Sequence, residues 1–183
     1  MRNKAHDLSA YAFSSGETLL LDANVWLFLF PAPSDRLPGF ATRYSGALKR
    51  MLAARTRLAL DVLILSEYLN RYCRIEWSAL HRTAYPQFKS FRQSSDFASV
   101  GQGAALYAHH MLRLCSRHDH LFATADVAQA LTDFELGAHD FNDGLLAETC
   151  RHHGWKLVTD DRDFTNGGIE VLTTNPVLLK ACP

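Results

Sequence analysis

The feature of this sequence that most constrains its fold is the alternation of short apolar runs with longer segments of helical periodicity. Each run has the length and composition of a buried strand, and most neighbouring runs are separated by apolar residues that repeat at helical spacing. The runs are Thr18–Leu21, Leu58–Leu60, Leu121–Ala123, Lys156–Thr159 and Ile169–Leu172. This order predicts an α/β fold in which helices cover both faces of a parallel sheet.

Polar residues and a glycine mark the expected helix boundaries. Asp61 precedes a segment with apolar residues at i and i+4, and Asp140 and Asn175 stand where a cap is expected to accept a hydrogen bond from the first turn. Gly154 ends the helix that begins near Asp140. Two more helices are expected, from about Gly103 and over 126–136, and irregular chain is expected over 31–39 and 94–103.

The length and composition favour one folded domain. The chain has 183 residues, of which 48% are hydrophobic and 21% are charged, which is typical of a globular protein. We expect an N-terminal leader over 1–17 and a core over about 18–173. The four cysteines form no CxxC pair, which disfavours a zinc module. No segment resembles a signal peptide or a membrane span, so a cytoplasmic location without membrane contact is the expectation.

A carboxylate and an amide interrupt the apolar run LLLDANVWLFLF, which extends from Leu19 to Phe30. Burial of an unpaired carboxylate costs several kcal/mol, so Asp22 requires a partner in a folded core. Its neighbour Asn24 is a second polar residue in the same run. The interruption therefore predicts that Asp22 belongs to a site, and a metal ion is the partner we expect.

Three further acids are expected at the edge of the sheet where Asp22 lies. Asp161 follows the strand over 156–159, Asp143 lies in the first turn of the helix before that strand, and Glu67 lies on the helix that follows the strand over 58–60. In open parallel sheets, ligands collect beyond the carboxyl ends of the strands. Carboxylates that converge repel each other unless a cation joins them, and ligation by oxygen alone favours Mg²⁺ or Mn²⁺. Such a site suggests phosphodiester chemistry.

The order and spacing of these residues also resemble a known family. The pieces are Asp22-Ala-Asn24, Leu65-Ser-Glu67, Asp143-Gly-Leu-Leu-Ala147 and Leu157-Val-Thr159-Asp-Asp161-Arg-Asp163-Phe164. Together they resemble a PIN-domain ribonuclease, a family that includes the VapC-type toxins of toxin–antitoxin pairs. The resemblance implies a three-layer α/β/α sandwich around a central, mostly parallel sheet. It also implies a Mg²⁺- or Mn²⁺-dependent endoribonuclease that hydrolyses single-stranded RNA, forms a homodimer and is paired with an antitoxin protein.

The resemblance assigns a role to each matching position. The catalytic and metal-binding acids are Asp22, Glu67, Asp143 and Asp161. Asp163 is the expected additional metal ligand, and Asn24 and Thr159 are expected to support the site. Asp140 is a reserve candidate because it lies one turn before Asp143, although an N-cap explains it better. Asp160 is assigned to a polar loop.

The segment between Glu67 and Asp143 is longer than compact toxins of this family usually have, which weakens the toxin interpretation more than the nuclease interpretation. Within it, Arg71, Arg74 and Trp77 are candidate RNA contacts, since cations bind phosphates and aromatic rings stack on unpaired bases. An ordinary amphipathic helix face explains the same residues. The histidines show no diagnostic spacing and are assigned structural or surface roles.

Two alternatives to a ribonuclease remain open. A catalytically silent interaction protein would use the acidic edge to bind a basic segment of a partner. A structure-specific DNase would use the same acids on another substrate. The formal net charge of zero is mild evidence against a tight DNA binder, but it does not rule out a local basic path to the phosphates.

Overall fold

The fold is built on a six-stranded sheet in the order β1-β6-β5-β2-β3-β4, in which all neighbouring strands pair in parallel. The structure is a computed structural model that describes residues 1–137 and 140–183. The strands are β1 (Lys4–Asp7), β2 (Thr18–Leu21), β3 (Arg57–Asp61), β4 (Ser116–His118), β5 (Lys156–Val158) and β6 (Glu170–Thr173).

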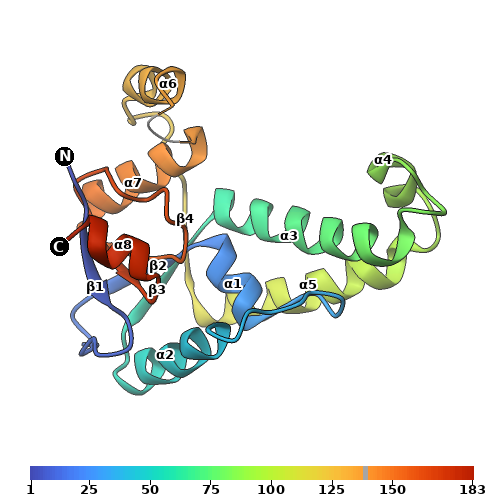
Figure 1. Cartoon of the computed structure of the whole chain (residues 1–183), viewed down its shortest axis with the longest axis horizontal. Coiled ribbons are helices and arrows are strands. Elements are labelled where there is room, and N and C mark those ends of the chain that lie inside the picture. Colours follow the sequence, from blue (N-terminus) through green and yellow to red (C-terminus); the bar gives the residue numbers. More distant parts are fainter. Residues whose placement is uncertain (138–139) are drawn as a thin grey trace.

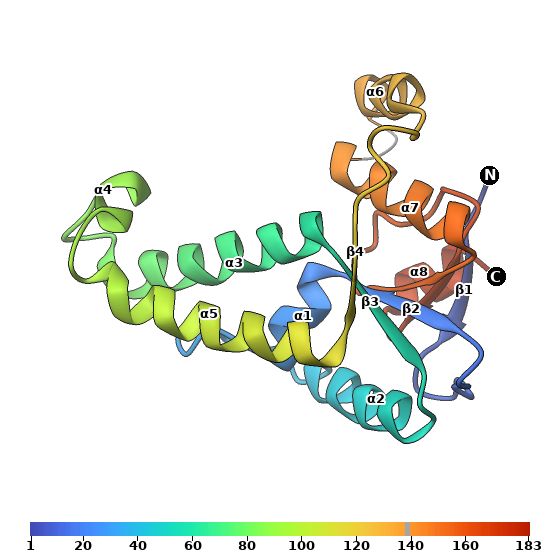
Figure 2. The same ribbon diagram turned by 180° about the vertical axis from the view of Figure 1, so that it is seen from behind.

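Helices occupy most of the chain between the strands. They are α1 (Ala23–Leu29), α2 (Ala41–Ala53), α3 (Val62–Glu76), the π-helix η1 (Trp77–His81), α4 (Phe88–Arg92), α5 (Phe97–Leu114), α6 (Val127–Glu135), α7 (Phe141–His153) and α8 (Pro176–Ala181). The strands lie between α7 on one side and α2 and α5 on the other (Figures 1 and 2). This arrangement confirms the predicted three-layer α/β/α fold.

The central strands are apolar because both of their faces are covered. Leu19, Leu20 and Leu21 of β2 are buried, as are the apolar residues of β3, β5 and β6 that pack beside them. Parallel strands covered on both faces read as continuous apolar runs, which is why the sequence revealed these four strands. Burial of such leucines contributes about 1.5–3 kcal/mol per side chain to the stability of the core.

The expected strand over Leu121–Ala123 is wrong. These residues form a turn in which the carbonyl oxygen of Leu121 accepts from the N–H groups of Thr124 and Ala125. The strand of this region is β4, which pairs with β3 at the edge of the sheet and consists of Ser, Arg and His. An edge strand needs no apolar run, because one side of it faces solvent.

The predicted helix starts are largely confirmed. The carboxylates of Asp61 and Asp140 accept from the N–H groups of Leu63 and Asn142, and Asn175 caps α8 in the same way. Gly154 ends α7 in the left-handed conformation, with a φ of 65°. The helix expected from Gly103 begins earlier, at Phe97, so it occupies much of the segment expected to be irregular.

The segment between Glu67 and Asp143 forms a helical extension. In both views α3 and α5 lie side by side and extend away from the sheet, with α4 at the far end (Figures 1 and 2). Near that end, Phe91 is fully buried, and its ring stacks on His81 with a centroid distance of 4.4 Å. No helix of the described residues is long and apolar enough to cross a membrane.

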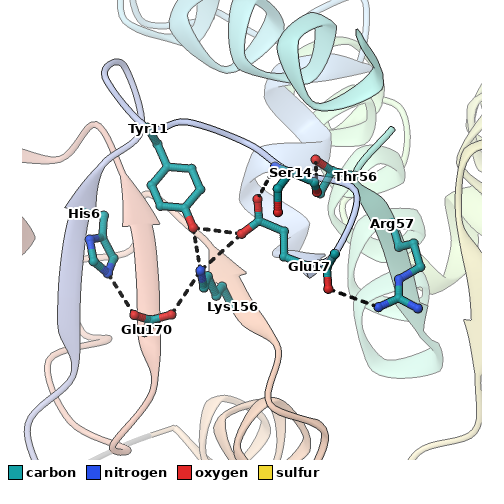
Figure 3. Close-up of polar contacts among 9 residues, drawn as sticks. His6, Tyr11, Ser14, Glu17, Thr56, Arg57, Lys156 and Glu170 are labelled. Atoms are coloured by element: carbon teal, nitrogen blue, oxygen red, sulfur yellow. Dashed lines mark hydrogen bonds and ion pairs between the residues drawn. The ribbon is translucent and has the colours of Figure 1, made fainter. Parts of the chain in front are cut away.

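The N-terminal segment, expected to be a leader over residues 1–17, contributes a strand to the sheet and a residue to the core. Residues 4–7 form β1, which pairs with β6, and Leu8 is fully buried in the core. The side chain of Lys156 on β5 holds the loop between β1 and β2 in place, because its Nζ lies 3.1 Å from Glu17 Oε2 in that loop and 3.2 Å from Glu170 Oε2 on β6 (Figure 3). Tyr11 donates to Glu17 in the same network, at 2.8 Å. The sheet and core therefore extend beyond the expected range of 18–173.

Lys156→Gln is expected to lower the free energy of unfolding by about 1–2 kcal/mol, because it leaves two partly buried carboxylates without their shared cation. Urea denaturation measures the change. Lys180→Gln is the matched control, since Lys180 forms no ion pair within the described residues. Equal effects of the two substitutions would show that the network does not hold the N-terminal loop.

Candidate functional site

The candidate site lies where the central strands end. Leu21 at the end of β2 pairs with Val158 at the end of β5, and the register of β2 and β3 places Asp61 at the same edge. The residues that follow β2 and β5 are Asp22 and Thr159, so the parallel sheet brings them side by side although they are 137 positions apart in the sequence. This is the edge at which open parallel sheets bind ligands.

Asp22 is a buried carboxylate that joins a strand to a helix. Only 5% of the residue is exposed, and it is the N-cap of α1. Its Oδ1 accepts from the N–H of Ala23 at 2.6 Å, and its Oδ2 accepts from Asn24 Nδ2 and from Thr159 Oγ1, both at 2.6 Å. Three donors thus fix one carboxylate, which explains how the polar interruption in the apolar run is tolerated.

Asn24 and Thr159 hold the loop after β5 as well as Asp22. The Asn24 Oδ1 accepts from the backbone N–H of Asp160 at 3.3 Å. The Thr159 hydroxyl donates to Asp22 and accepts from the N–H of Asp161 at 3.0 Å. Both residues were expected to support the site, and each has a direct contact with Asp22 through which to do so.

Burial and neighbouring charges raise the pKa of two carboxylates at this edge. Burial raises the pKa of Asp22 to about 6, and the nearby charges of Glu67 and Asp161 add to the increase. Burial also raises the pKa of Asp143 to about 8, with further contributions from Asp22 and Asp161. Glu67 and Asp161 therefore lie close enough to Asp22 and Asp143 to disfavour the ionisation of these two carboxylates.

No basic side chain compensates most of this negative charge. Within residues 1–137 and 140–183, none of the ion pairs includes Asp22, Asp143 or Asp161. Glu67 differs, because its Oε1 lies 3.2 Å from Arg71 Nη1 one turn further along α3. Within the described residues, three of the four acids thus have no basic side chain as a partner.

The remaining predicted site residues lie at the margin. Asp140 accepts from the N–H of Asn142, so its observed role is the N-cap of α7. Its charge also contributes to the raised pKa of Asp143. Asp163 has a side chain that is 75% exposed and lies 3.9 Å from the Arg162 guanidinium. The additional ligand role of Asp163 stays a prediction.

The three candidate RNA contacts all have partners within the chain. Arg71 pairs with Glu67, and the Arg74 guanidinium lies 4.5 Å from the centroid of the Phe88 ring. The indole N–H of Trp77 donates to the carbonyl oxygen of Tyr85 at 2.8 Å. These contacts give each residue a structural role on the helical extension.

Tyr44 and Asp160 are positioning residues that the sequence did not reveal. The buried Tyr44 hydroxyl donates to Asp160 Oδ1 at 2.8 Å and accepts from the N–H of Thr174 at 3.3 Å. Asn175 donates to the carbonyl oxygen of Asp160 at 2.7 Å. Burial raises the pKa of Tyr44 to about 12, so its hydroxyl keeps its proton at neutral pH. Asp160 is therefore a fixed member of the loop between Thr159 and Asp161.

The described side chains at this edge are of the chemical type that a hard divalent cation prefers, but they do not form a complete set of ligands around one position. In the part of the chain that the structure describes, no group of three or more His, Cys, Asp or Glu side chains is arranged to hold a metal ion. The available donors are carboxylate oxygens, which Mg²⁺ and Mn²⁺ prefer, and a cation would offset the repulsion that helps to raise the pKa of Asp22 and Asp143. Mg²⁺ also keeps several waters when it binds to carboxylates, so it does not require a closed cage of protein ligands.

Comparison with known proteins identifies the family. A search of curated proteins found no match to this chain. A scan of protein families matches the PIN domain to residues 19–169. PIN domains are typically nucleases and generally use divalent metal ions. The match extends from β2 to the residue before β6 and includes all four predicted acids, and on this evidence the chain belongs to the PIN domain family.

Proposed function

We propose that this chain is an endoribonuclease that uses Mg²⁺ or Mn²⁺ to hydrolyse phosphodiester bonds of single-stranded RNA. Asp22, Glu67, Asp143 and Asp161 hold the cation directly or through water. The observation that carries the proposal is the raised pKa of the buried Asp22 and the half-buried Asp143 at the carboxyl edge of a parallel sheet. Carboxylates with raised pKa values and no basic partner at such an edge are typical of a functional site that binds a cation.

The residues around Asp22 keep its carboxylate in place. The bonds from Ala23, Asn24 and Thr159 hold Asp22 in one orientation, so little ordering is required when a ligand binds. When bound, the cation supplies an activated water for in-line attack and neutralises charge that develops on the phosphate. The Thr159 hydroxyl also fixes the N–H of Asp161, which links two of the acids through one side chain.

Asp143 is expected to release a proton when the cation binds. Its pKa of about 8 means that much of the metal-free protein carries a proton on this carboxylate at neutral pH. Carboxylate ligands bind metals in the deprotonated form, so the cation and the proton compete. Metal affinity therefore increases with pH up to about this pKa.

Partner proteins and cellular role are part of the same proposal. The motifs that resemble VapC-type toxins support a toxin that an antitoxin protein inhibits, that forms a homodimer and that acts in the cytoplasm. The helical extension of α3 and α5 (Figure 1) contains the segment after Glu67 whose length, by the resemblance, exceeds that of compact toxins and weakens the toxin role. Growth arrest on expression of wild type, but not of Asp22→Asn, would support the toxin role.

A catalytically silent interaction protein is the second candidate, and one observation favours it. Arg71 already neutralises Glu67, which is the state expected if this carboxylate has no metal to bind. The two candidates differ in turnover. Assays on single-stranded RNA, duplex DNA and flap DNA, each with Mg²⁺ or Mn²⁺, separate a ribonuclease, a structure-specific DNase and a silent protein.

Asp22→Asn is expected to reduce RNA cleavage by about a hundredfold or more, because it removes the best-fixed anionic ligand. The rate of cleavage of a labelled single-stranded RNA in Mn²⁺ measures the loss. Asp119→Asn is the matched control, because Asp119 is exposed. Thermal unfolding of both variants verifies that the fold is retained. Full metal-dependent activity of a folded Asp22→Asn variant would refute the site assignment.

The stability of the metal-free protein is expected to depend on pH through Asp143. The folded-state pKa of about 8 exceeds the ordinary value of 3.8, so the folded state binds more protons than the unfolded state between these values. The contribution of Asp143 is therefore fully present below about pH 4 and is lost as the pH rises through about 8. Urea denaturation in chelator across this range measures the decline.

Asp143→Asn is expected to flatten the decline, and Asp119→Asn is expected to leave it unchanged. Addition of Mn²⁺ at about pH 8 is expected to raise the unfolding temperature of the wild type more than that of Asp143→Asn. Identical pH profiles for wild type and Asp143→Asn would show that the repulsion at this edge is not coupled to folding.

A further inference from the structure

A pocket with both polar and apolar lining residues lies beside the acidic edge. It has a volume of about 280 Å³ and is lined by residues at the start of α2, in the loop after β5 and at the start of α8, namely Phe40, Arg43, Asp160, Thr174, Asn175 and Pro176. Asp160 connects the two sites, since it lines the pocket and lies between Thr159 and Asp161 in the chain. The volume is at the lower end for small-ligand sites, which suits one small group.

Thr174 lines this pocket, and its hydroxyl has no hydrogen-bond partner in the described structure. The residue is 6% exposed, and its Oγ1 is buried. Its backbone is fixed, because its N–H donates to the Tyr44 hydroxyl. Buried hydroxyls are nearly always paired, since an unpaired one loses its bonds to water without replacement. Thr174 therefore leaves one buried polar atom unsatisfied at the wall of the pocket.

The other lining residues add a cation and an aromatic ring. The guanidinium of Arg43 forms no ion pair or hydrogen bond with the rest of the described chain, and the residue is exposed. Phe40 is 36% exposed, and its ring meets Phe28 at an interplanar angle of 89°. An arginine suits a phosphate, and an aromatic ring suits the face of an unpaired base.

The acidic side of the pocket is held rigidly. Asp160 accepts from Tyr44 through its carboxylate and from Asn175 through its carbonyl oxygen. A carboxylate repels a phosphate but accepts from the amino group of a base or from a ribose hydroxyl. The pocket thus offers a cation, an acceptor, a neutral hydroxyl and an aromatic ring, which together match the parts of one nucleotide.

We propose that this pocket receives one unpaired nucleotide of the RNA strand, next to the phosphodiester bond held at Asp22. The base lies against Phe40, its edge meets Thr174 and Asp160, and Arg43 binds the adjoining phosphate. The inference rests on the proposed ribonuclease function and adds a site that selects single strands, because bases in a duplex cannot stack on a protein side chain without leaving the helix.

The first test measures RNA binding without catalysis. Short labelled oligonucleotides of rU, rA or rC are titrated in EDTA with wild type, Arg43→Gln and Lys49→Gln at several salt concentrations. Lys49 is the control because it is an exposed cation on the same helix and does not line the pocket. Loss of one phosphate contact in Arg43→Gln is expected to make the negative slope of log K against log salt shallower by about 0.7. Lys49→Gln is expected to keep the wild-type slope.

The second test addresses the base. Phe40→Leu is expected to weaken binding about fivefold or more if the ring stacks on a base. Thr174→Val keeps the shape of the side chain and removes the unpartnered hydroxyl. It is expected to change the ratio of affinities among rU, rA and rC by about threefold without a lower unfolding temperature, because no internal bond is lost. A purely structural role of Thr174 would leave these ratios unchanged.

Cleavage assays on the same samples separate this inference from the proposed function. If wild type cleaves RNA and Arg43→Gln has the salt slope of Lys49→Gln, the pocket assignment fails and the ribonuclease stands. If RNA does not bind the wild type in EDTA, the pocket assignment also fails. If the slope and base ratios change as expected but no divalent cation supports cleavage, the nucleotide pocket stands and the ribonuclease proposal fails.

Discussion

The hydrogen bond from Thr159 to Asp22 is the contact on which the rest of the site depends. It joins the residues that follow β2 and β5, and it places the loop of Asp160 and Asp161 against the start of α1. The same carboxylate is the N-cap of α1, so one side chain sets the direction of a helix and the position of a distant loop. Asn24 strengthens this arrangement, because its amide bridges Asp22 and the backbone of Asp160. Loss of this contact would remove one of the three donors to Asp22 and the direct bond between the residues that follow β2 and β5.

The fold supports the site at an energetic cost. Parallel strands place their carboxyl ends together, and α7 brings Asp143 to the same edge, where burial and neighbouring charges make ionisation unfavourable. A protein selected for stability alone has little reason to keep such groups, whereas a metal site benefits from them. The pocket beside Asp160 also contains an unfavourable feature, because the buried hydroxyl of Thr174 has no hydrogen-bond partner in the described structure.

The sequence predicted the parts of the fold where one local signal dominates. The central strands are covered on both faces and read as apolar runs, and polar caps mark the starts of α3, α7 and α8. It did not predict α1 as a helix, because Ala23, Val25, Trp26 and Leu27 are all buried and leave no polar face to show helical periodicity. Nor did it predict α2, so the contact between Tyr44 and Asp160 had no visible signal. The proximity of the four acids was predicted from strand order, while the pairing of Glu67 with Arg71 depends on side-chain geometry that no pattern specifies.

The composition of β4 has a consequence for how the protein behaves in solution. This strand ends the sheet at one side, and a sheet edge exposes N–H and C=O groups that can recruit a strand from another molecule. β4 has only three residues, and Ser116 and Arg117 are exposed, so it offers a short and charged template. Such edges oppose aggregation, because an incoming strand gains few hydrogen bonds and must desolvate a guanidinium. The polarity that concealed β4 in the sequence therefore also protects the sheet from adding strands of neighbouring molecules.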